Sequence, residues 1–379
     1  MLPITLTCAD YARVMPLATG EVKPEGIALT MLLGSRGSWP AHADMINRAV
    51  QDPKVQGGEW SMAQYLYRID KGDRRYVGLP VFPLRNFTAR DLYVRRGGPI
   101  KGPADLSGKR IGMYSWSASG SLWYRHFLRH VGLDPATIQW WVGDIDTPWS
   151  AQPMDAAGLP AGLKTPPPGR SLSDMLIAGE IEAIYSPPRP QHYHPERGSI
   201  ARLFPDFRRV EQEYFRKTGA FPPQHLIVLR RETWEANPWI AKSLTDAFSA
   251  ANDSFTAAQK GFPYATPWLE AELEETESVM GADFHPFGFE RNRPQIEMFA
   301  GEAFKLPAEG DRVIDAVVNN ALGLAAELGK AGANAVGADE EGDAAKGQAA
   351  DESPSQKRTS DAHGNDPFTN ASRKRLRLF

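Results

Sequence analysis

The stretch SLSDMLIAGEIEAIYSPPRP, residues 171–190, indicates the fold more directly than any other part of the chain. Ser171 is suited to cap a short amphipathic helix, and Gly179 is suited to end it. An apolar strand is predicted over residues 181–185, and it runs directly into a polar loop that contains Arg189. A helix, a tight stop, a strand and a loop at the strand's carboxyl end form a unit of an α/β sheet, in which ligands bind beyond the strand ends.

Length and charge limit the classes of function. With 379 residues, the chain is long enough for two domains and a well-buried core. Hydrophobic residues make up 42% of it and charged residues 23%, which is typical of a globular protein. The net charge of −3 provides no bulk attraction to nucleic acid or to acidic membranes, so neither is expected as a partner.

The cysteine content and the N-terminus favour a cytoplasmic location. Cys8 is the only cysteine, which excludes an intrachain disulfide and a cysteine-rich metal site. The first residues, MLPITLTCADYARV, lack the basic region and apolar run of a secretion signal. No apolar run approaches the roughly 20 residues that a membrane helix needs.

The remaining pattern alternates strands and helices. Strands are predicted at 3–8, 27–33, 79–82, 90–95, 138–142 and 224–231, and helices at 41–51, 117–130, 238–258, 267–280 and 293–304. Residues 103–113 are predicted as a short helix, a turn and then a strand. Residues 59–71 are predicted as a loop that enters a helix, and the Pro- and Gly-rich residues 147–170 as a surface excursion.

The C-terminal region has a different composition. Residues 329–372 have no periodic apolar face, so a disordered tail is predicted over 329–379. Its basic and apolar tip, 373–379, is interpreted as a solvated end, with a nuclear-import or docking peptide as the alternative.

Four longer segments carry a family resemblance. They are GKRIGMYSWSASGSLWYRHFL (108–128), RSLSDMLIAGEIEAIYSPPRP (170–190), GAFPPQHLIVLRRETWEANPWIAKSLTDAF (219–248) and PWLEAELEETESVMGADFHPFGFERNR (267–293). With these segments the chain, from residue 4 to about residue 325, resembles the 4,5-dihydroxyphthalate decarboxylase family, whose fold is similar to that of periplasmic binding proteins. The tail lies outside the resemblance.

The resemblance implies a two-lobe α/β fold of the periplasmic-binding-protein type (type II). The two lobes would be joined by two crossing hinge strands, near 88–94 and near 224–230. Residues 1–90 with 226–325 would form lobe one, and residues 91–225 lobe two. The ligand would lie in the cleft between the lobes.

The resemblance also implies a reaction. The family removes CO2 from 4,5-dihydroxyphthalate and leaves protocatechuate, a step in the breakdown of phthalate and related aromatic compounds. A ring hydroxyl para to the departing carboxylate supplies electrons, so no cofactor is expected. Such a site needs cations for the retained carboxylate, a base near the phenol and an acid near the ring carbon. The partner would be a small aromatic acid, and a homo-oligomer is plausible.

Three residues are candidates for the chemistry. His225 begins the second crossing strand and is suited to proton transfer near neutral pH, although a structural histidine is the commoner case. Glu59 would take the phenol proton or cap the following helix. Arg85 follows a strand and would clamp a carboxylate, or pair with an acid on the surface.

Six further residues are candidates for substrate binding. The serines of YSWSASGSLW precede a helix, where backbone N–H groups bind anions, and the same serines suit ordinary capping. Arg189 would close over a carboxylate from lobe two, and Tyr11 would line the pocket or fill the lobe. The predicted substrate-binding residues are Tyr11, Ser61, Ser115, Ser117, Ser119 and Arg189.

The loop histidines are weak candidates for a metal site. His192 and His194, with Asp144 and Asp146 nearby in the sequence, have only loose spacing for metal ligands. Solvated loop histidines are the commoner case, and no metal is predicted.

Two other functions compete with the decarboxylase. A solute-binding protein would recognise an aromatic or small organic acid without turnover, and the absence of an export signal speaks against it. Thiamine-precursor chemistry on the same fold would call for an iron site with histidine and cysteine, which the single Cys8 does not support.

Overall fold

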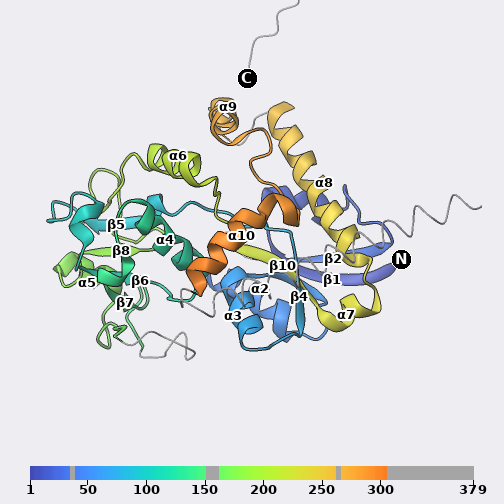
Figure 1. Ribbon diagram of the computed structural model, residues 1–379, viewed down its shortest axis with the longest axis horizontal. Helices are drawn as coiled ribbons and strands as arrows, with labels where there is room; N and C mark the ends of the chain where they lie inside the picture. Colours follow the sequence, from blue (N-terminus) through green and yellow to red (C-terminus); the bar gives the residue numbers. More distant parts are fainter. Residues whose placement is uncertain (35–38, 151–161, 262–265, 305–379) are drawn as a thin grey trace, which may run out of the picture. The chain divides into compact units, whose positions relative to one another are not determined.

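In the computed structural model, which describes residues 1–34, 39–150, 162–261 and 266–304, the stretch 171–190 forms a helix followed by a strand (Figure 1). Helix α5 covers Leu172–Ala178 and begins with a capping box formed by Ser171 and Asp174. Gly179 ends the helix with φ 77°, a left-handed conformation that glycine adopts without steric cost. Strand β8, Ala183–Tyr185, follows and begins two residues later than predicted.

The strands form two five-stranded sheets (Figure 1). The first sheet has the order β2-β1-β3-β10-β4, and the second has the order β7-β6-β8-β5-β9. In each sheet one strand runs antiparallel to both of its neighbours: β10 between β3 and β4, and β5 between β8 and β9. The mixed α/β two-sheet architecture expected from the sequence is thus confirmed. The strands are β1 Leu2–Ala9, β2 Ile27–Gly34, β3 Gly57–Ser61, β4 Tyr76–Leu79, β5 Leu92–Arg95, β6 Arg110–Met113, β7 Gln139–Val142, β9 Ile200–Arg202 and β10 His225–Arg230.

Two chain segments connect the sheets, and they pair with each other. The first leads from β4 to β5, and the second leads into β10. Asn86 N donates to Pro222 O (3.1 Å) and Gln224 N donates to Leu84 O (2.9 Å), as in a short antiparallel ladder. Leu84, Asn86 and Pro222 lie two to four positions before the ranges 88–94 and 224–230 that were predicted to cross, and Gln224 is the first residue of the second range. The lobe boundaries at 90 and 225 stay a prediction, and the predicted tail lies outside the described residues.

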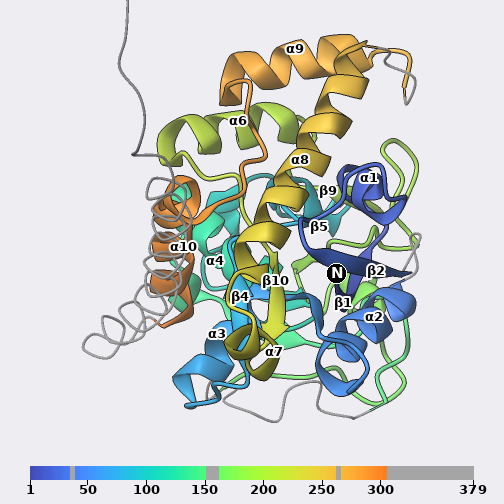
Figure 2. The same cartoon turned by 90° about the vertical axis from the view of Figure 1, so that its right-hand side faces the viewer.

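Ten α-helices surround the sheets in the described part of the chain (Figure 2). Helix α2 packs on β1 and β3, α8 packs on α1, and α10 packs on α4. Helices α1, α6 and α7 and strand β9 were not predicted. None of the described helices is both long enough and apolar enough to span a membrane. Besides α5, the helices are α1 Met15–Ala18, α2 Trp39–Gln51, α3 Met62–Asp70, α4 Ser119–His130, α6 Phe207–Thr218, α7 Arg231–Ala236, α8 Ile240–Gly261, α9 Leu269–Met280 and α10 Phe289–Ala303.

Two predicted boundaries near the first sheet were wrong. Residues 59–71 were predicted as a loop that enters a helix, but residues 59–61 belong to β3, in the middle of the sheet. The strand predicted over 79–82 ends at Leu79 instead. Pro80 and Pro83 follow, and they have no N–H to donate to a strand ladder.

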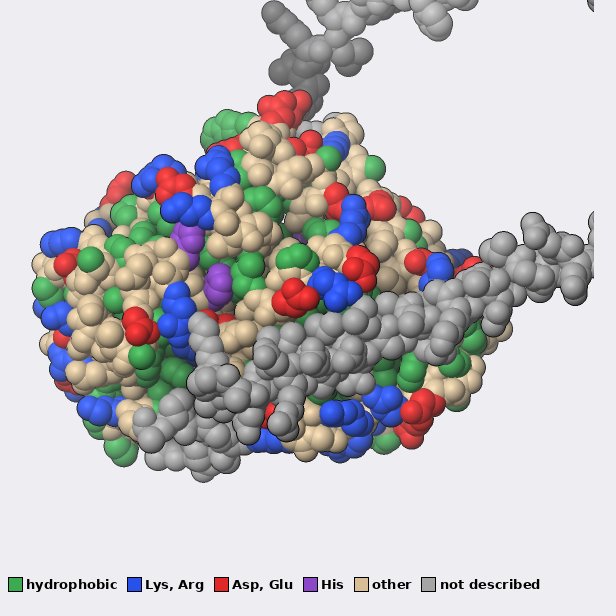
Figure 3. All heavy atoms as spheres, viewed as in Figure 1, with side chains coloured by type: hydrophobic (Ala, Val, Ile, Leu, Met, Phe, Trp, Pro, Cys, Tyr) green, Lys and Arg blue, Asp and Glu red, His purple; other side chains and the backbone are tan. Residues whose placement is uncertain are grey.

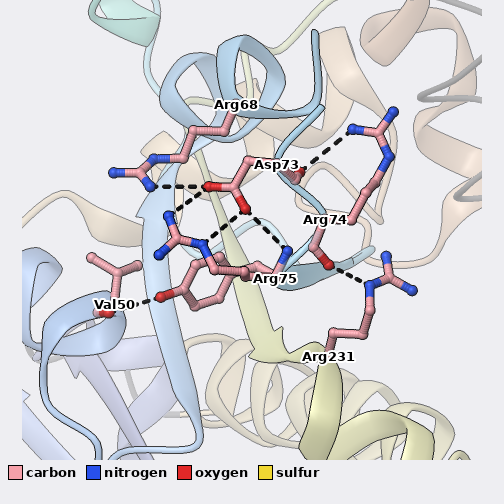
Figure 4. A network of polar contacts seen from close by, with 7 residues as sticks. Val50, Arg68, Asp73, Arg74, Arg75 and Arg231 are labelled. Carbon is pink, nitrogen blue, oxygen red and sulfur yellow. Dashed lines mark hydrogen bonds and ion pairs between the residues drawn. The ribbon is translucent and has the colours of Figure 1, made fainter. Parts of the chain in front are cut away.

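The turn between α3 and β4 is held by one carboxylate (Figure 4). Asp73 accepts hydrogen bonds from Arg68 Nη1 (3.2 Å) and from Arg75 Nη2 (2.8 Å), and these arginines hold the pKa of its carboxyl below the usual range. Arg231, at the start of α7, donates to the carbonyl of Arg74. This network fixes the edge of the first sheet.

On the face of the molecule seen in Figure 3, acidic and basic side chains are interspersed.

The close approach of β3 to β10 requires glycine at position 57. A Cβ atom built there would lie 2.0 Å from the carbonyl oxygen of Val228. We therefore expect Gly57→Ala to lower the free energy of unfolding by about 3 kcal/mol or more, as measured by urea denaturation. Gly301→Ala in α10 is the matched control, because no atom lies within 4 Å of its Cβ position and alanine favours a helix. Equal stability of the two variants would contradict this account.

Candidate functional site

The candidate site is built around Glu59, which lies in β3 with no exposed surface. One carboxylate oxygen, Oε2, accepts from Ala9 N (2.8 Å) and from Cys8 Sγ (3.5 Å). The other, Oε1, accepts from the Tyr11 hydroxyl (2.8 Å) and from His225 Nδ1 (2.6 Å). Because β1 and β3 are parallel neighbours, the end of β1 delivers Cys8 and Ala9 to the same edge of the sheet as Glu59.

This environment decides the charge of Glu59. Burial by itself would raise the pKa of the carboxyl, but the hydrogen bond and charge of His225, helped by His42 and by Ala9 N, outweigh it and lower the pKa to about 2. Glu59 is therefore a buried carboxylate at neutral pH. Its negative charge and burial in turn raise the pKa values of the Cys8 thiol and the Tyr11 hydroxyl well above their usual range, burial being the larger cause in both.

His225 is oriented by Glu59. It is the first residue of β10 and lies opposite Ser61 of β3 in the antiparallel pair. An ionised carboxylate only accepts hydrogen bonds, so the proton of this contact lies on His225 Nδ1. The side chain is 11% exposed, and its second ring nitrogen, Nε2, can act on another group. The structure therefore brings two of the three residues predicted for the chemistry, Glu59 and His225, into direct contact.

His42 joins this pair and was not among the predicted residues. It lies in α2 and is buried; its Nε2 is 3.8 Å from Glu59 Oε1, and its ring stacks on that of His225 with centroids 5.4 Å apart. Burial lowers the pKa of His42, and the charge of His225 adds to this, while Glu59 opposes it. A signal was present in the sequence: His42 shares its helix face with buried Met45 and Ala49, at i, i+3 and i+7.

The same three residues have a spacing that could hold a divalent cation. One ligand atom from each of His42, Glu59 and His225 lies within 4.8 Å of the others. These residues are not the loop histidines His192 and His194, whose sequence spacing is too loose to predict a metal site. Two imidazoles and a carboxylate are ligand types that bind zinc, iron or manganese.

Three of the predicted serines meet next to this cluster. The hydroxyl oxygens of Ser61, which caps α3, and Ser119, the first residue of α4, lie 2.9 Å apart. Ser119 Oγ also accepts from Ala63 N (3.1 Å), and Gln64 Nε2 donates to Ser117 Oγ (3.3 Å). These hydrogen bonds connect the element after β3 to the helix after β6, and they lie beside His225, because Ser61 is its strand partner. Ser115 is half-buried in the loop before α4, and its carbonyl accepts from the hydroxyl of Ser121 (2.5 Å).

Arg85 does not lie in this cluster. Its Nη1 donates to Phe221 O (2.8 Å) and Gln295 Oε1 (3.0 Å), and its Nη2 donates to Pro286 O (3.0 Å) and to Asn292. These acceptors are neutral groups of the protein, and burial lowers the pKa of the guanidinium to about 9. Its position fits a structural tie between the crossing segments and α10 better than the predicted carboxylate clamp.

Arg189 and Tyr185, at the end of the stretch 171–190, have opposite environments. Arg189 is exposed on the loop, whereas Tyr185 is fully buried and stacks on Tyr124 with ring centroids 4.4 Å apart. Among the described residues, the Tyr185 hydroxyl has no hydrogen-bond partner. The structure thus assigns Tyr185 to the interior of the second sheet and leaves Arg189 at the surface.

Comparisons with known proteins confirm the resemblance that the four segments indicated. The chain is 29% identical to 4,5-dihydroxyphthalate decarboxylase of Comamonas testosteroni over 307 residues, which are 79% of this chain and 90% of the relative. It is 27% identical to 4,5-dihydroxyphthalate decarboxylase of Pseudomonas putida over 218 residues, 57% of this chain and 82% of the relative. Both relatives are carboxy-lyases by name, the enzyme class expected from the sequence.

One solved structure among those that resemble the chain is a Candida albicans gene product with the generic periplasmic-binding-protein fold. It has 12% sequence identity and a TM-score of 0.45, and the match covers 84% of this chain and 95% of that one. No protein-family model matches the chain.

Proposed function

We propose that this protein, which resembles 4,5-dihydroxyphthalate decarboxylases over most of its length, is a decarboxylase of a hydroxylated aromatic dicarboxylic acid. The substrate that its relatives' name suggests is 4,5-dihydroxyphthalate, with protocatechuate and CO2 as products. The observation that carries the proposal is the buried contact of 2.6 Å between Glu59 and His225. A carboxylate that orients an imidazole is an arrangement suited to proton transfer.

The proposed reaction needs one proton delivered to one ring carbon. The phenol para to the departing carboxylate gives its proton to a base and regains one after CO2 has left; in between, the electron density of the phenolate makes the carbon that bears the carboxylate basic. His225 Nε2 donates a proton to this carbon, so that an N–H bond breaks and a C–H bond forms. The C–CO2 bond then breaks, its electron pair restores the aromatic ring, and a solvent proton returns to His225.

Glu59 supports this step as a positioning residue. Its Oε1 fixes the tautomer of His225, and its negative charge stabilises the protonated imidazole that must exist before transfer. Oε2 is held by Ala9 N and Cys8 Sγ, which prevents the carboxylate from turning away. The charge that supports the acid is thus supplied by the fold before substrate binds.

We assign substrate binding to the serine cluster beside His225. Ser117 and Ser119 lie at the start of α4, where hydroxyls and backbone N–H groups suit a carboxylate. Tyr11 contacts Glu59 and is half-buried, a position that suits contact with an aromatic ring. Arg189, on its exposed loop, stays a candidate for closing over the second carboxylate.

One experiment separates this function from the alternative, a binding protein for an aromatic or small organic acid. Purified protein is incubated with 4,5-dihydroxyphthalate, and CO2 and protocatechuate are followed over time. Release of both in equal amounts supports the decarboxylase. Phthalate is the matched control, because it has both carboxylates but no hydroxyl, and no CO2 is expected from it. Tight binding of the dihydroxy acid without CO2 would favour the binding protein.

A further inference from the structure

The hydroxyl of Tyr185 is buried at the start of α4. Because β6 and β8 are parallel neighbours, with Met113 opposite Tyr185, the end of β8 delivers this side chain to the edge at which the chain leaves β6 for α4. A Cβ atom built on Gly120, the second residue of α4, would lie 2.8 Å from the Tyr185 hydroxyl oxygen. The tyrosine hydroxyl is thus aimed at the first turn of the helix.

This hydroxyl is a donor without an acceptor. Tyr185 has no exposed surface, and among the described residues its hydroxyl has no hydrogen-bond partner. Burial raises the pKa of the hydroxyl well above its usual range, so the group keeps its proton. Polar groups buried in a protein are nearly always hydrogen-bonded, and a buried donor without a partner therefore points to an acceptor that arrives with a ligand.

The N-terminus of α4 has the same need. Ala118, the N-cap residue, makes no side-chain cap hydrogen bond, because alanine has no side-chain acceptor. The first intrahelical bond runs from Leu122 N to Ala118 O (3.1 Å), so the N–H groups of Ser119, Gly120 and Ser121 precede the helical ladder. All three of these residues are buried. Such an end carries a partial positive charge and favours an anion.

One carboxylate would satisfy both needs. Its two oxygens only accept hydrogen bonds, so one can accept from the Tyr185 hydroxyl and the other from the first N–H groups of α4. Glycine at position 120 lets the hydroxyl approach the helix backbone closely. The place adjoins the proposed chemistry, because Ser119 Oγ lies 2.9 Å from Ser61 Oγ and Ser61 is the strand partner of His225.

The two carboxylates of an aromatic dicarboxylic acid have different fates in a decarboxylation. The departing carboxylate loses its charge as CO2 forms, so donors that stabilise this charge would raise the barrier. The retained carboxylate keeps its charge throughout, and donors can hold it tightly without opposing the reaction. A helix N-terminus and a tyrosine hydroxyl are therefore suited to the retained carboxylate.

We propose that the Tyr185 hydroxyl and the N-terminus of α4 form the subsite for the retained carboxylate, and that Tyr185 determines the preference for an acid that carries it. This inference rests on the proposed decarboxylase function and names the atoms that hold its substrate. Protocatechuate, the proposed product, carries only the retained carboxylate. It is therefore the probe for this subsite, and its binding can be measured without turnover.

The test is Tyr185→Phe, which removes the hydroxyl and keeps the ring that stacks on Tyr124. The Kd for protocatechuate, measured by isothermal titration calorimetry, should rise about tenfold, because a hydrogen bond to a charged group is lost. The KM for 4,5-dihydroxyphthalate should rise by a similar factor, while kcat stays within about threefold. The free energy of unfolding without ligand should not fall, because the hydroxyl makes no hydrogen bond within the described part of the protein.

Tyr124→Phe is the matched control. It makes the same exchange in the other ring of the stack, and its hydroxyl is not among the three atoms nearest to the Cβ position of Gly120. Its Kd for protocatechuate should equal that of the unmodified protein. Equal losses of affinity in Tyr124→Phe and Tyr185→Phe would assign the effect to the stacked rings and overturn the role of the hydroxyl.

Other results would also overturn the inference. They are a Kd for Tyr185→Phe within about twofold of the unmodified protein, a loss confined to kcat, failure of Tyr185→Phe to fold, and no binding of protocatechuate by the unmodified protein. A binding loss of the expected size supports the subsite even if the unmodified protein releases no CO2 from 4,5-dihydroxyphthalate. That second result would overturn the proposed function alone, so the two failures are distinguishable.

Discussion

Decarboxylation by a His225→Asn variant is expected to be about 10²–10⁴-fold slower than by the unmodified protein, because the variant has no group that can protonate the ring carbon. Asparagine is the informative replacement. Its amide N–H lies close to the position of His225 Nδ1 and can still donate to Glu59, so the buried carboxylate keeps a hydrogen bond. What is lost is the second ring nitrogen, Nε2, and with it the proton that the reaction consumes.

The measurement is kcat and KM for 4,5-dihydroxyphthalate, with the free energy of unfolding measured on the same preparation. The loss should fall on kcat, since His225 acts in the chemical step and the serine cluster that is proposed to bind the substrate is unchanged. A loss confined to KM would identify His225 as a binding residue and contradict its role as the acid. Turnover within a factor of two of the unmodified protein would remove His225 from the mechanism altogether.

Glu59→Gln is expected to have the largest effect on stability among substitutions in the site. The folded protein lowers the pKa of this carboxyl from 4.5 to about 2, so the ionised form stabilises the fold relative to the unfolded chain. The shift corresponds to roughly 3 kcal/mol at neutral pH. Glutamine keeps the shape of the glutamate side chain, but it has no negative charge to attract His225. Its amide N–H2 group would also lie against groups that donate to Glu59, such as Ala9 N or the Tyr11 hydroxyl. We therefore expect the variant to unfold at a markedly lower urea concentration at pH 7.

The pH dependence of this difference has a definite sign. Because the folded-state pKa lies below the unfolded one, the contribution of Glu59 is fully present above about pH 4.5 and is lost as the pH falls toward about 2. The stability gap between the unmodified protein and Glu59→Gln should therefore narrow over this range. Arg85→Lys is a useful comparison, because it disturbs a buried polar cluster away from Glu59. The difference in free energy of unfolding between the unmodified protein and Arg85→Lys should not narrow over this pH range. A gap for Glu59→Gln that is constant from pH 7 to pH 3 would contradict the ionised state assigned to Glu59.

The sequence predicted the kinds of residue in the site better than their positions. Glu59 and His225 were chosen separately, and their contact follows from the register of β3 and β10, which no local pattern of the chain reveals. Glu59 was predicted in a loop, but it lies in a strand that begins with two glycines, residues that usually indicate a turn. Here Gly57 serves the close approach of β3 to the carbonyl of Val228 instead.

Arg85 shows where local reasoning fails for a different reason. An arginine after a strand suggested a free cation, but its acceptors Asn292 and Gln295 come from α10, more than 200 residues later in the chain. Only the packing of α10 decides whether this guanidinium faces a ligand or the protein. By contrast, the cap at Ser171 and the stop at Gly179 were predicted correctly, because both depend on residues within a few positions of each other.

The insertion of β10 between β3 and β4 has a consequence for biosynthesis. Glu59 and His225 are 166 residues apart, so a growing chain carries the carboxylate on the ribosome long before its histidine partner is made. Every strand of the second sheet, up to β9, is synthesised in that interval. Closing so long a loop is a slow, non-local step, and the first sheet can be completed only after it. Assembly of the proton-transfer pair is therefore a late event in folding, and the appearance of activity during translation would report that the first sheet has closed.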